Sequence, residues 1–232
     1  MERPLITVGV FTSWAMKFSI LGVVFYALFY KGDIPLAILA LAAFGITLTP
    51  TILSRNYRIT LPPYLDFLIA LALMLDIVFG EGARFYDWVT GWDWMTHFIG
   101  TFVIAMFAFS MVYTFHYTGK LRLSLPFIAF FTMMASLAVG ALWEIAEFIV
   151  DHFGYNSQKG LNNTMWDLIF DAVGGVAVAV LGVLYMRYLV HRERRQLVSP
   201  FKRFFKTFFS IEMPKFKRLR KKRWRGKDER VH

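Results

Sequence analysis

The chain contains no cysteine, which excludes both disulfide bonds and metal sites built on thiolates. Charged residues are also scarce, at 18% of the 232 residues, against about a quarter in a typical soluble domain. No internal repeat is long enough to indicate a duplicated transporter. What the chain lacks therefore points away from a soluble globular protein.

Hydrophobic residues make up 57% of the chain and fall in long blocks separated by short polar turns. Blocks of this length are typical of transmembrane helices, and they predict an all-α, polytopic bundle of about six spans. The expected helices cover about residues 11–30, 34–53, 63–79, 93–117, 126–150 and 165–190. Lys17 interrupts the first block and is expected to snorkel to the surface. Residues 1–195 are assigned to the bundle and residues 196–232 to a basic tail.

The net charge of +10 belongs to the tail. Residues 1–190 hold ten Lys or Arg and twelve Asp or Glu, whereas residues 191–232 hold sixteen and four. With an even number of spans both termini share one side, which also receives the basic loops at residues 55–58 and 120–122. The basic residues on the opposite side are Lys31, Arg84 and Lys159. The positive-inside rule therefore predicts cytoplasmic termini in an inner or plasma membrane.

Three polar motifs interrupt the apolar helices, at residues 92–97, 143–147 and 163–171. Each holds two ionisable side chains three or four residues apart, a spacing that places both on one face of a helix. The pairs are Asp93 and His97, Glu144 and Glu147, and Asp167 and Asp171. The predicted topology brings all three to the outer ends of their helices, where charges beside lipid are costly unless they pair or bind an ion.

Small residues share the helix faces of these acids, including Gly140 and Ser136 with Glu144, and Gly175 with Asp171. Small side chains let transmembrane helices approach closely, so the acid-bearing faces are expected to look inward. Glu144, His97 and Asp171 are expected to lie deepest, with Asp93, Glu147 and Asp167 nearer the rim. A structural role is favoured for Asp66 and Asp76, because each stands alone.

Carboxylates grouped with one imidazole suit a divalent cation, with Zn, Mg or Mn as candidates. The expected metal ligands are His97, Glu144, Glu147, Asp167 and Asp171. The expected catalytic residues are Glu144, Asp171 and His97, and the further pocket residues are Asp93, Thr164 and Trp143. Without a metal, a carboxylate of the cluster can serve as a general acid or base or in a proton relay. The structural alternative is a hydrogen-bonded cluster in which Asp93 and Asp167 cap their helices.

The tail combines a phenylalanine stripe with basic residues. Ser199-Pro200 is a typical helix start, and phenylalanines recur at helical spacing from Phe201 onward. This pattern predicts a helix on the cytoplasmic leaflet, followed by a polybasic run that contacts anionic headgroups. The expected lipid-surface residues are Phe201, Phe204, Phe205, Phe208, Lys221, Lys222 and Arg223. Nucleic-acid binding competes for the basic run but is disfavoured by the stripe and the adjacent span, so no nucleic acid is expected as a partner.

A family resemblance rests on residues of the three motifs: Asp93, His97, Phe98 and Gly100, then Trp143, Glu144 and Glu147, then Thr164, Asp167, Asp171 and Gly174. In these residues the chain resembles the YjdF-like family of bacterial and archaeal membrane proteins and, more distantly, VanZ-type proteins. VanZ-type proteins favour Gln near the second Glu and Asn near the last Asp, so Glu147 and Asp171 make the YjdF-like match the closer one. The resemblance covers roughly residues 60–190 and implies an integral membrane protein without an established activity. VanZ-type proteins are associated with glycopeptide resistance, by a mechanism that the motif does not reveal.

Three functions are compatible with these patterns. The first is a metal-dependent enzyme acting on a lipid or lipid-linked substrate from the outer leaflet. The second is a proton- or ion-coupled transporter using the same carboxylates, although the small apolar residues below the acids argue against a polar path. The third is a non-catalytic membrane protein whose polar cluster is structural.

Overall fold

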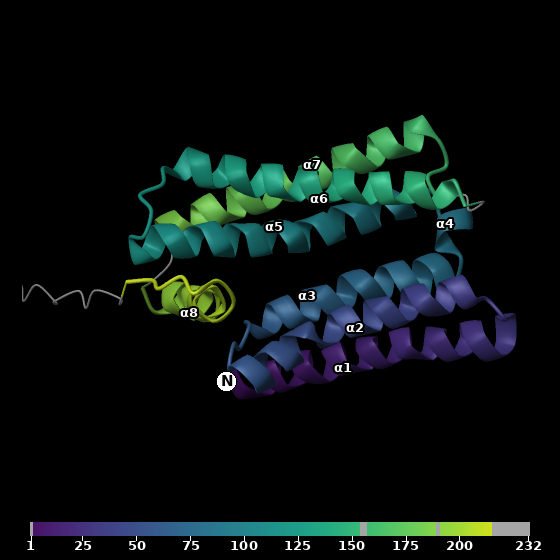
Figure 1. Ribbon diagram of the computed structural model, residues 1–232, viewed down its shortest axis with the longest axis horizontal. Coiled ribbons are helices and arrows are strands. Elements are labelled where there is room, and N and C mark those ends of the chain that lie inside the picture. Colours follow the sequence, from purple (N-terminus) through teal and green to yellow (C-terminus); the bar gives the residue numbers. More distant parts are fainter. Residues whose placement is uncertain (1, 154–156, 189–190, 215–232) are drawn as a thin grey trace, which may run out of the picture.

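The computed structural model describes residues 2–153, 157–188 and 191–214, and within these ranges it contains helices and no strands (Figure 1). The elements are α1 (Glu2–Tyr26), η1 (Ala27–Lys31), α2 (Ile34–Tyr57), α3 (Pro63–Met74), η2 (Leu75–Gly82), α4 (Phe85–Trp88), α5 (Trp92–Thr118), α6 (Leu125–Asp151), α7 (Leu161–Tyr188) and α8 (His191–Phe209). Six helical segments of the described chain are long and apolar enough to cross a membrane. The prediction of an all-α bundle with six spans is confirmed.

The spans form two groups of three helices each. Figure 1 shows α1, α2 and α3 together on one side and α5, α6 and α7 together on the other. The first group packs around Ile20, Ala40 and Ile77, and the second around Ala105, Phe109 and Val178. The three motifs all lie in the second group, so the candidate site belongs to α5, α6 and α7.

The third span differs from the prediction at its end. Residues 75–82 continue the helix as a π-helical segment, where a loop had been expected from Gly80 onward. A Cβ at Gly80 would collide with the ring of Tyr86, so the glycine lets the chain fold back closely into α4. π-Helical turns are frequent at functional sites, and this one carries Asp76 toward the motifs.

Lys17 does not snorkel, because it has a buried partner on another helix. Its side chain is 1% exposed, and its Nζ lies 2.7 Å from Oδ1 of Asp66 on α3. The other carboxylate oxygen of Asp66 accepts a hydrogen bond of 2.6 Å from the Ser13 hydroxyl. The two charges therefore join α1 to α3, and Asp66 does not stand alone.

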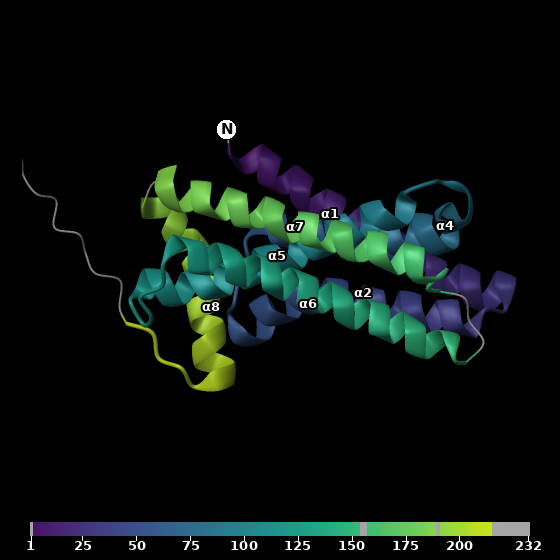
Figure 2. The same cartoon turned by 90° about the horizontal axis from the view of Figure 1, so that it is seen from above.

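Helix α8 runs across the bundle rather than along it, as Figures 1 and 2 together show. It begins before the predicted start at Ser199 and includes Pro200. Phe201 and Phe205 are 3% and 8% exposed and pack with Leu65 and Met213, so for these two residues the predicted lipid contact is wrong. Phe204 is partly buried, and Phe208 is exposed as expected.

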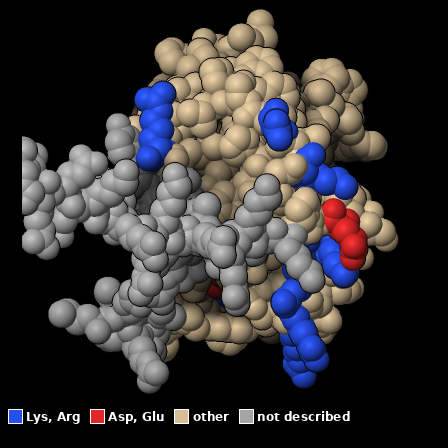
Figure 3. Space-filling view, turned by 90° about the vertical axis from the view of Figure 1, so that its left-hand side faces the viewer, with Lys and Arg blue, Asp and Glu red and all other residues tan. Residues whose placement is uncertain are grey.

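Basic side chains gather at the α8 end of the molecule. Figure 3 faces this end and shows Lys and Arg spread over its described surface. The predicted headgroup contacts Lys221, Lys222 and Arg223 lie outside the described residues. The assignment of a tail at residues 196–232 stays a prediction.

Candidate functional site

The site lies at the end of the bundle next to α4, where α5 and α7 begin and α6 ends (Figure 1). Gly91, in the left-handed region at φ 80°, turns the chain into α5 just before Asp93. Gly160, at φ 91°, precedes α7 in the same way. Because these turns set where α5 and α7 start, they bring the polar first turns of both helices to one level beside Glu144.

His97 stands at the centre of the cluster, with its side chain 8% exposed. Its Nδ1 lies 3.1 Å from Oδ1 of Asp171, within hydrogen-bond distance. Its Nε2 faces Oε1 of Glu144 at 3.6 Å and Oδ1 of Asp93 at 3.9 Å, distances too long for hydrogen bonds. A neutral ring that donates from Nδ1 to Asp171 therefore keeps an Nε2 lone pair directed at the other acids.

Asn163 links two further acids near the histidine, Asp93 and Asp167. Its amide nitrogen donates to Oδ2 of Asp93 at 3.1 Å and also to Oδ2 of Asp167. Ligand atoms of Asp93, His97 and Asp167 all lie within 4.8 Å of one another. One imidazole nitrogen and two carboxylate oxygens at this separation can bind a single divalent cation.

Small residues let the three helices meet behind the acids. A Cβ at Gly140 on α6 would collide with the Asp171 carboxylate, and one at Gly174 would collide with Thr101 on α5. The Ser136 hydroxyl lies 3.1 Å from the Thr101 carbonyl and 3.3 Å from the Asp171 carbonyl. The small-residue faces found in the sequence therefore do pack against one another.

Four buried carboxylate oxygens have no hydrogen-bond partner among the described residues. They are both oxygens of Glu144, Oδ1 of Asp167 and Oδ2 of Asp171, and all three side chains are buried. The burial of Asp167 corrects its predicted position near the rim, because its side chain is as fully buried as that of Asp171. A buried charge is costly without a partner or a metal, so these oxygens call for a cation or a proton.

Glu147 lies apart from the histidine. It is half-buried, and its Oε1 accepts a 3.0 Å hydrogen bond from Nε1 of Trp143, which is 46% exposed. No hydrogen bond or ion pair within the described ranges joins Glu147 to His97 or Asp171. Thr164 is half-buried on the first turns of α7, with its hydroxyl in the interior.

Tyr86 connects the site to the first group of helices. Its hydroxyl donates to Oδ1 of Asp76 at 2.6 Å and lies 3.2 Å from Oγ1 of Thr96, which itself donates to the Asp93 carbonyl. Burial, and then the negative charge of Asp76, raise the pKa of Tyr86 well above its ordinary value. The phenol is thus held as a neutral donor, and Asp76 is not isolated.

Sequence patterns missed Tyr86, Lys159 and Asn163 as site residues. Tyr86 lies in the short helix α4 and Lys159 in the loop before α7, so no helical spacing ties either of them to the motifs. Nζ of Lys159 lies 3.6 Å from Oδ2 of Asp93, so the lysine ammonium places a positive charge beside the acid cluster. Asn163 stands four residues before Asp167, and that helical spacing was the one available signal.

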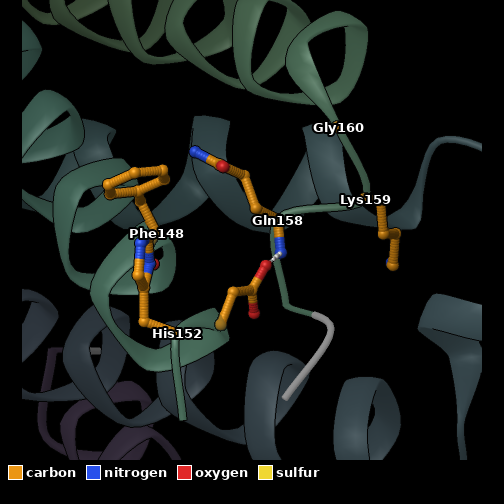
Figure 4. Close-up of a pocket in the computed structure, with 6 residues that line it drawn as sticks. Phe148, His152, Gln158, Lys159 and Gly160 are labelled. Atoms are coloured by element: carbon orange, nitrogen blue, oxygen red, sulfur yellow. Dashed lines mark hydrogen bonds between the residues drawn. The ribbon is translucent and has the colours of Figure 1, made fainter. Parts of the chain in front are cut away.

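A cavity of about 390 Å³ lies beside the cluster, at the end of α6 (Figure 4). It is lined by Phe148, Asp151, His152, Gln158, Lys159 and Gly160. None of the three potential metal ligands is among these residues. The cavity therefore adjoins the site at Lys159, which lines it and also lies 3.6 Å from Asp93.

Comparison with known proteins gives a family and a relative. A family model described as "Predicted membrane protein (DUF2238)" matches residues 12–188. An uncharacterized protein of Thermotoga maritima is 33% identical over 135 residues, which cover 56% of this chain and 68% of that protein. No solved structure matches. The described part of the chain holds six apolar helices, and the protein is a multi-pass integral membrane protein, as its composition predicted.

Proposed function

The chain belongs to the DUF2238 family of membrane proteins, and on this premise we propose that its acid and histidine cluster binds a divalent cation. The observation that carries the proposal is the convergence of Asp93, His97 and Asp167 from two helices, with ligand atoms within 4.8 Å. The unpartnered, fully buried oxygen of Asp167 supports it, because a cation would neutralise that charge. A donor set of one nitrogen and two carboxylate oxygens suits Zn or Mn, and Mg less well.

Asp171 fits the role of a positioning residue rather than a ligand. Metal-binding histidines usually donate their second ring nitrogen to a carboxylate, which fixes the tautomer and the ring orientation. The 3.1 Å contact between Nδ1 of His97 and Asp171 has this form, and it leaves Nε2 for the metal. Three protein ligands would leave open coordination positions for water or for an oxygen of a substrate.

Glu144 is the best placed general base. Its buried carboxylate lies 3.6 Å from Nε2 of His97, next to the proposed metal position. A metal lowers the pKa of bound water and polarises a phosphoryl or carbonyl oxygen, and a nearby carboxylate can accept the proton. The proposed activity is therefore metal-dependent catalysis on a lipid or lipid-linked substrate, with the site facing the outer leaflet and the termini in the cytoplasm.

Transport by the same carboxylates is supported less well. Deeper in the group, the buried hydroxyls of Ser110, Thr114 and Thr132 donate to carbonyls of their own helices at 2.7–2.8 Å. A proton relay needs hydroxyls that bond onward to one another or to water. If Asp171→Asn abolished ion flux in proteoliposomes, transport would become the better proposal.

The proposed likeness to the YjdF-like and VanZ-type proteins rests on the order and spacing of the three motifs, and it assigns no activity to this chain. A purely structural cluster remains the third alternative. It predicts that Glu144→Gln lowers abundance and stability, while no divalent metal changes the stability of the wild type.

Metal analysis of the purified full chain tests the proposal. After chelation and reloading with Zn or Mn, we expect about one bound ion and a higher melting temperature, since ligand at a hundredfold its Kd adds about 2.7 kcal/mol. Asp167→Asn, which is nearly isosteric, should lose most of this binding. Glu147→Gln is the matched control and should bind as the wild type does. A wild type with neither bound metal nor a thermal shift would refute the metal site.

A further inference from the structure

Lys159 brings a positive charge to the rim of the acid cluster. Its Nζ lies 3.6 Å from Oδ2 of Asp93, and its side chain is 34% exposed. The same ammonium donates to the Tyr86 carbonyl at 3.2 Å and lies over the Tyr86 ring, 5.0 Å from its centre. Asp93 is the one acid that the described residues give Lys159 as an ion-pair partner.

The chain before α7 is built to hold this lysine in place. The Asp151 carboxylate accepts hydrogen bonds from the backbone nitrogens of Ser157 at 2.6 Å and Gln158 at 3.1 Å. Figure 4 marks the hydrogen bond at Gln158 and shows the Lys159 side chain directed away from Phe148 and His152. Lys159 itself has φ 48°, a conformation that is uncommon and unfavourable for a residue with a side chain. The fold therefore accepts local strain at Lys159, and the ammonium reaches Asp93.

A metal on Asp93 would change what Lys159 can bind. Asp93 is a ligand in the proposed site, and coordination would divert its charge from the ammonium. The metal and the ammonium would then be two positive charges close together at a partly exposed rim. An anion that bridges them would satisfy both, as phosphate oxygens do between a metal ion and a lysine in phosphoryl-transfer sites.

We propose that Lys159 is the anion-binding group of this site. Without metal it is the counter-ion of Asp93, and with metal bound it takes the phosphate group of the ligand, whether a lipid headgroup or free phosphate. This inference rests on the proposed divalent-cation site and adds the substrate class. Apolar side chains near this end, with Trp143 46% and Phe148 53% exposed, favour a phosphorylated amphiphile.

The test is a binding cycle with Mn²⁺ and phosphate. Mn²⁺ affinity of the full chain in neutral detergent is measured by electron paramagnetic resonance, with and without inorganic phosphate. We expect phosphate to tighten Mn²⁺ binding of the wild type by about fivefold or more. In Lys159→Met, Mn²⁺ alone should bind about tenfold more tightly, because a competing charge is gone, and phosphate should have no effect. Lys159→Arg should restore the phosphate effect.

Lys120→Met is the matched control, since this exposed lysine lies beyond the other end of α5, and it should behave as the wild type. Nanodiscs with phosphatidic acid, compared with phosphatidylcholine, distinguish the source: an effect confined to phosphatidic acid supports a lipid headgroup, and one shared with inorganic phosphate supports phosphate in general. A phosphate effect that persists in Lys159→Met overturns the inference and leaves the metal site standing. A wild type that binds no Mn²⁺ overturns the metal site itself.

Discussion

Gly140→Ala adds one methyl group at the point where α6 meets the acid of α7. The new Cβ would overlap the Asp171 carboxylate, whereas a Cβ at Gly100 on α5 would meet no atom within 4 Å. Overpacking of a tight interior lowers folding stability by about 1–3 kcal/mol, and replacing glycine with alanine in a helix raises it by about 0.5–1 kcal/mol. Gly140→Ala should therefore destabilise the protein by about 1–2 kcal/mol, while Gly100→Ala should be neutral or slightly stabilising.

Gly140→Ala should also lower the affinity for the proposed metal, because it displaces Asp171. A displaced carboxylate no longer holds Nδ1 of His97 at 3.1 Å, and losing such an outer-shell contact typically costs 10- to 100-fold in metal affinity. Thermal unfolding and Mn²⁺ titration of both glycine variants in one detergent measure the two effects. The reasoning is refuted if Gly140→Ala matches Gly100→Ala in melting temperature and in metal affinity.

Two further predictions concern contacts outside the site. Lys17→Met leaves Asp66 without its buried partner and should lower the free energy of unfolding by about 3–5 kcal/mol, whereas Lys17→Met combined with Asp66→Leu should recover much of the loss. Denaturation in mixed micelles measures both free energies of unfolding. A double variant whose loss equals the sum of the two single losses would contradict the prediction. Phe205→Ala should destabilise by about 3–5 kcal/mol because the ring is buried, and Phe209→Ala, which removes a ring that is 60% exposed, should cost much less. Equal melting temperatures for the two phenylalanine variants would show that α8 is not docked.

The transmembrane architecture could be predicted because a bilayer imposes its thickness on the sequence. Each span needs about 20 apolar residues, and the blocks that met this requirement are spans in the structure. The prediction failed at Gly80, where the helix continues as a π-helical segment. In this segment the ring of Tyr86 packs closely against Gly80, and a hydropathy pattern carries no information about that contact.

Within the site, helical spacing could predict which side chains share a face but not how deep each one lies. Asp167 was placed near the rim because it comes one turn before Asp171, yet both are fully buried. Its depth depends on how α7 is rotated and shifted against α5, and packing at Gly174 and Thr101 sets that relation. Contacts between distant segments, such as Lys17 with Asp66 or Lys159 with Asp93, could not be predicted from helical spacing either, because they too depend on how the segments pack.

The two groups of helices are held together by side-chain contacts at both ends of their length. Near the site, Tyr86 bonds Asp76 of the first group and contacts Thr96 of the second. At the other end, the α8 rings Phe201 and Phe205 pack against α3 and α5 together. Two bodies joined at one end can swing apart like a hinge, but bodies joined at both ends can separate only by bowing in the middle. A long acyl or polymer chain entering between the two groups would therefore have to bend α3 or α5, or first break the contacts at one of these two ends.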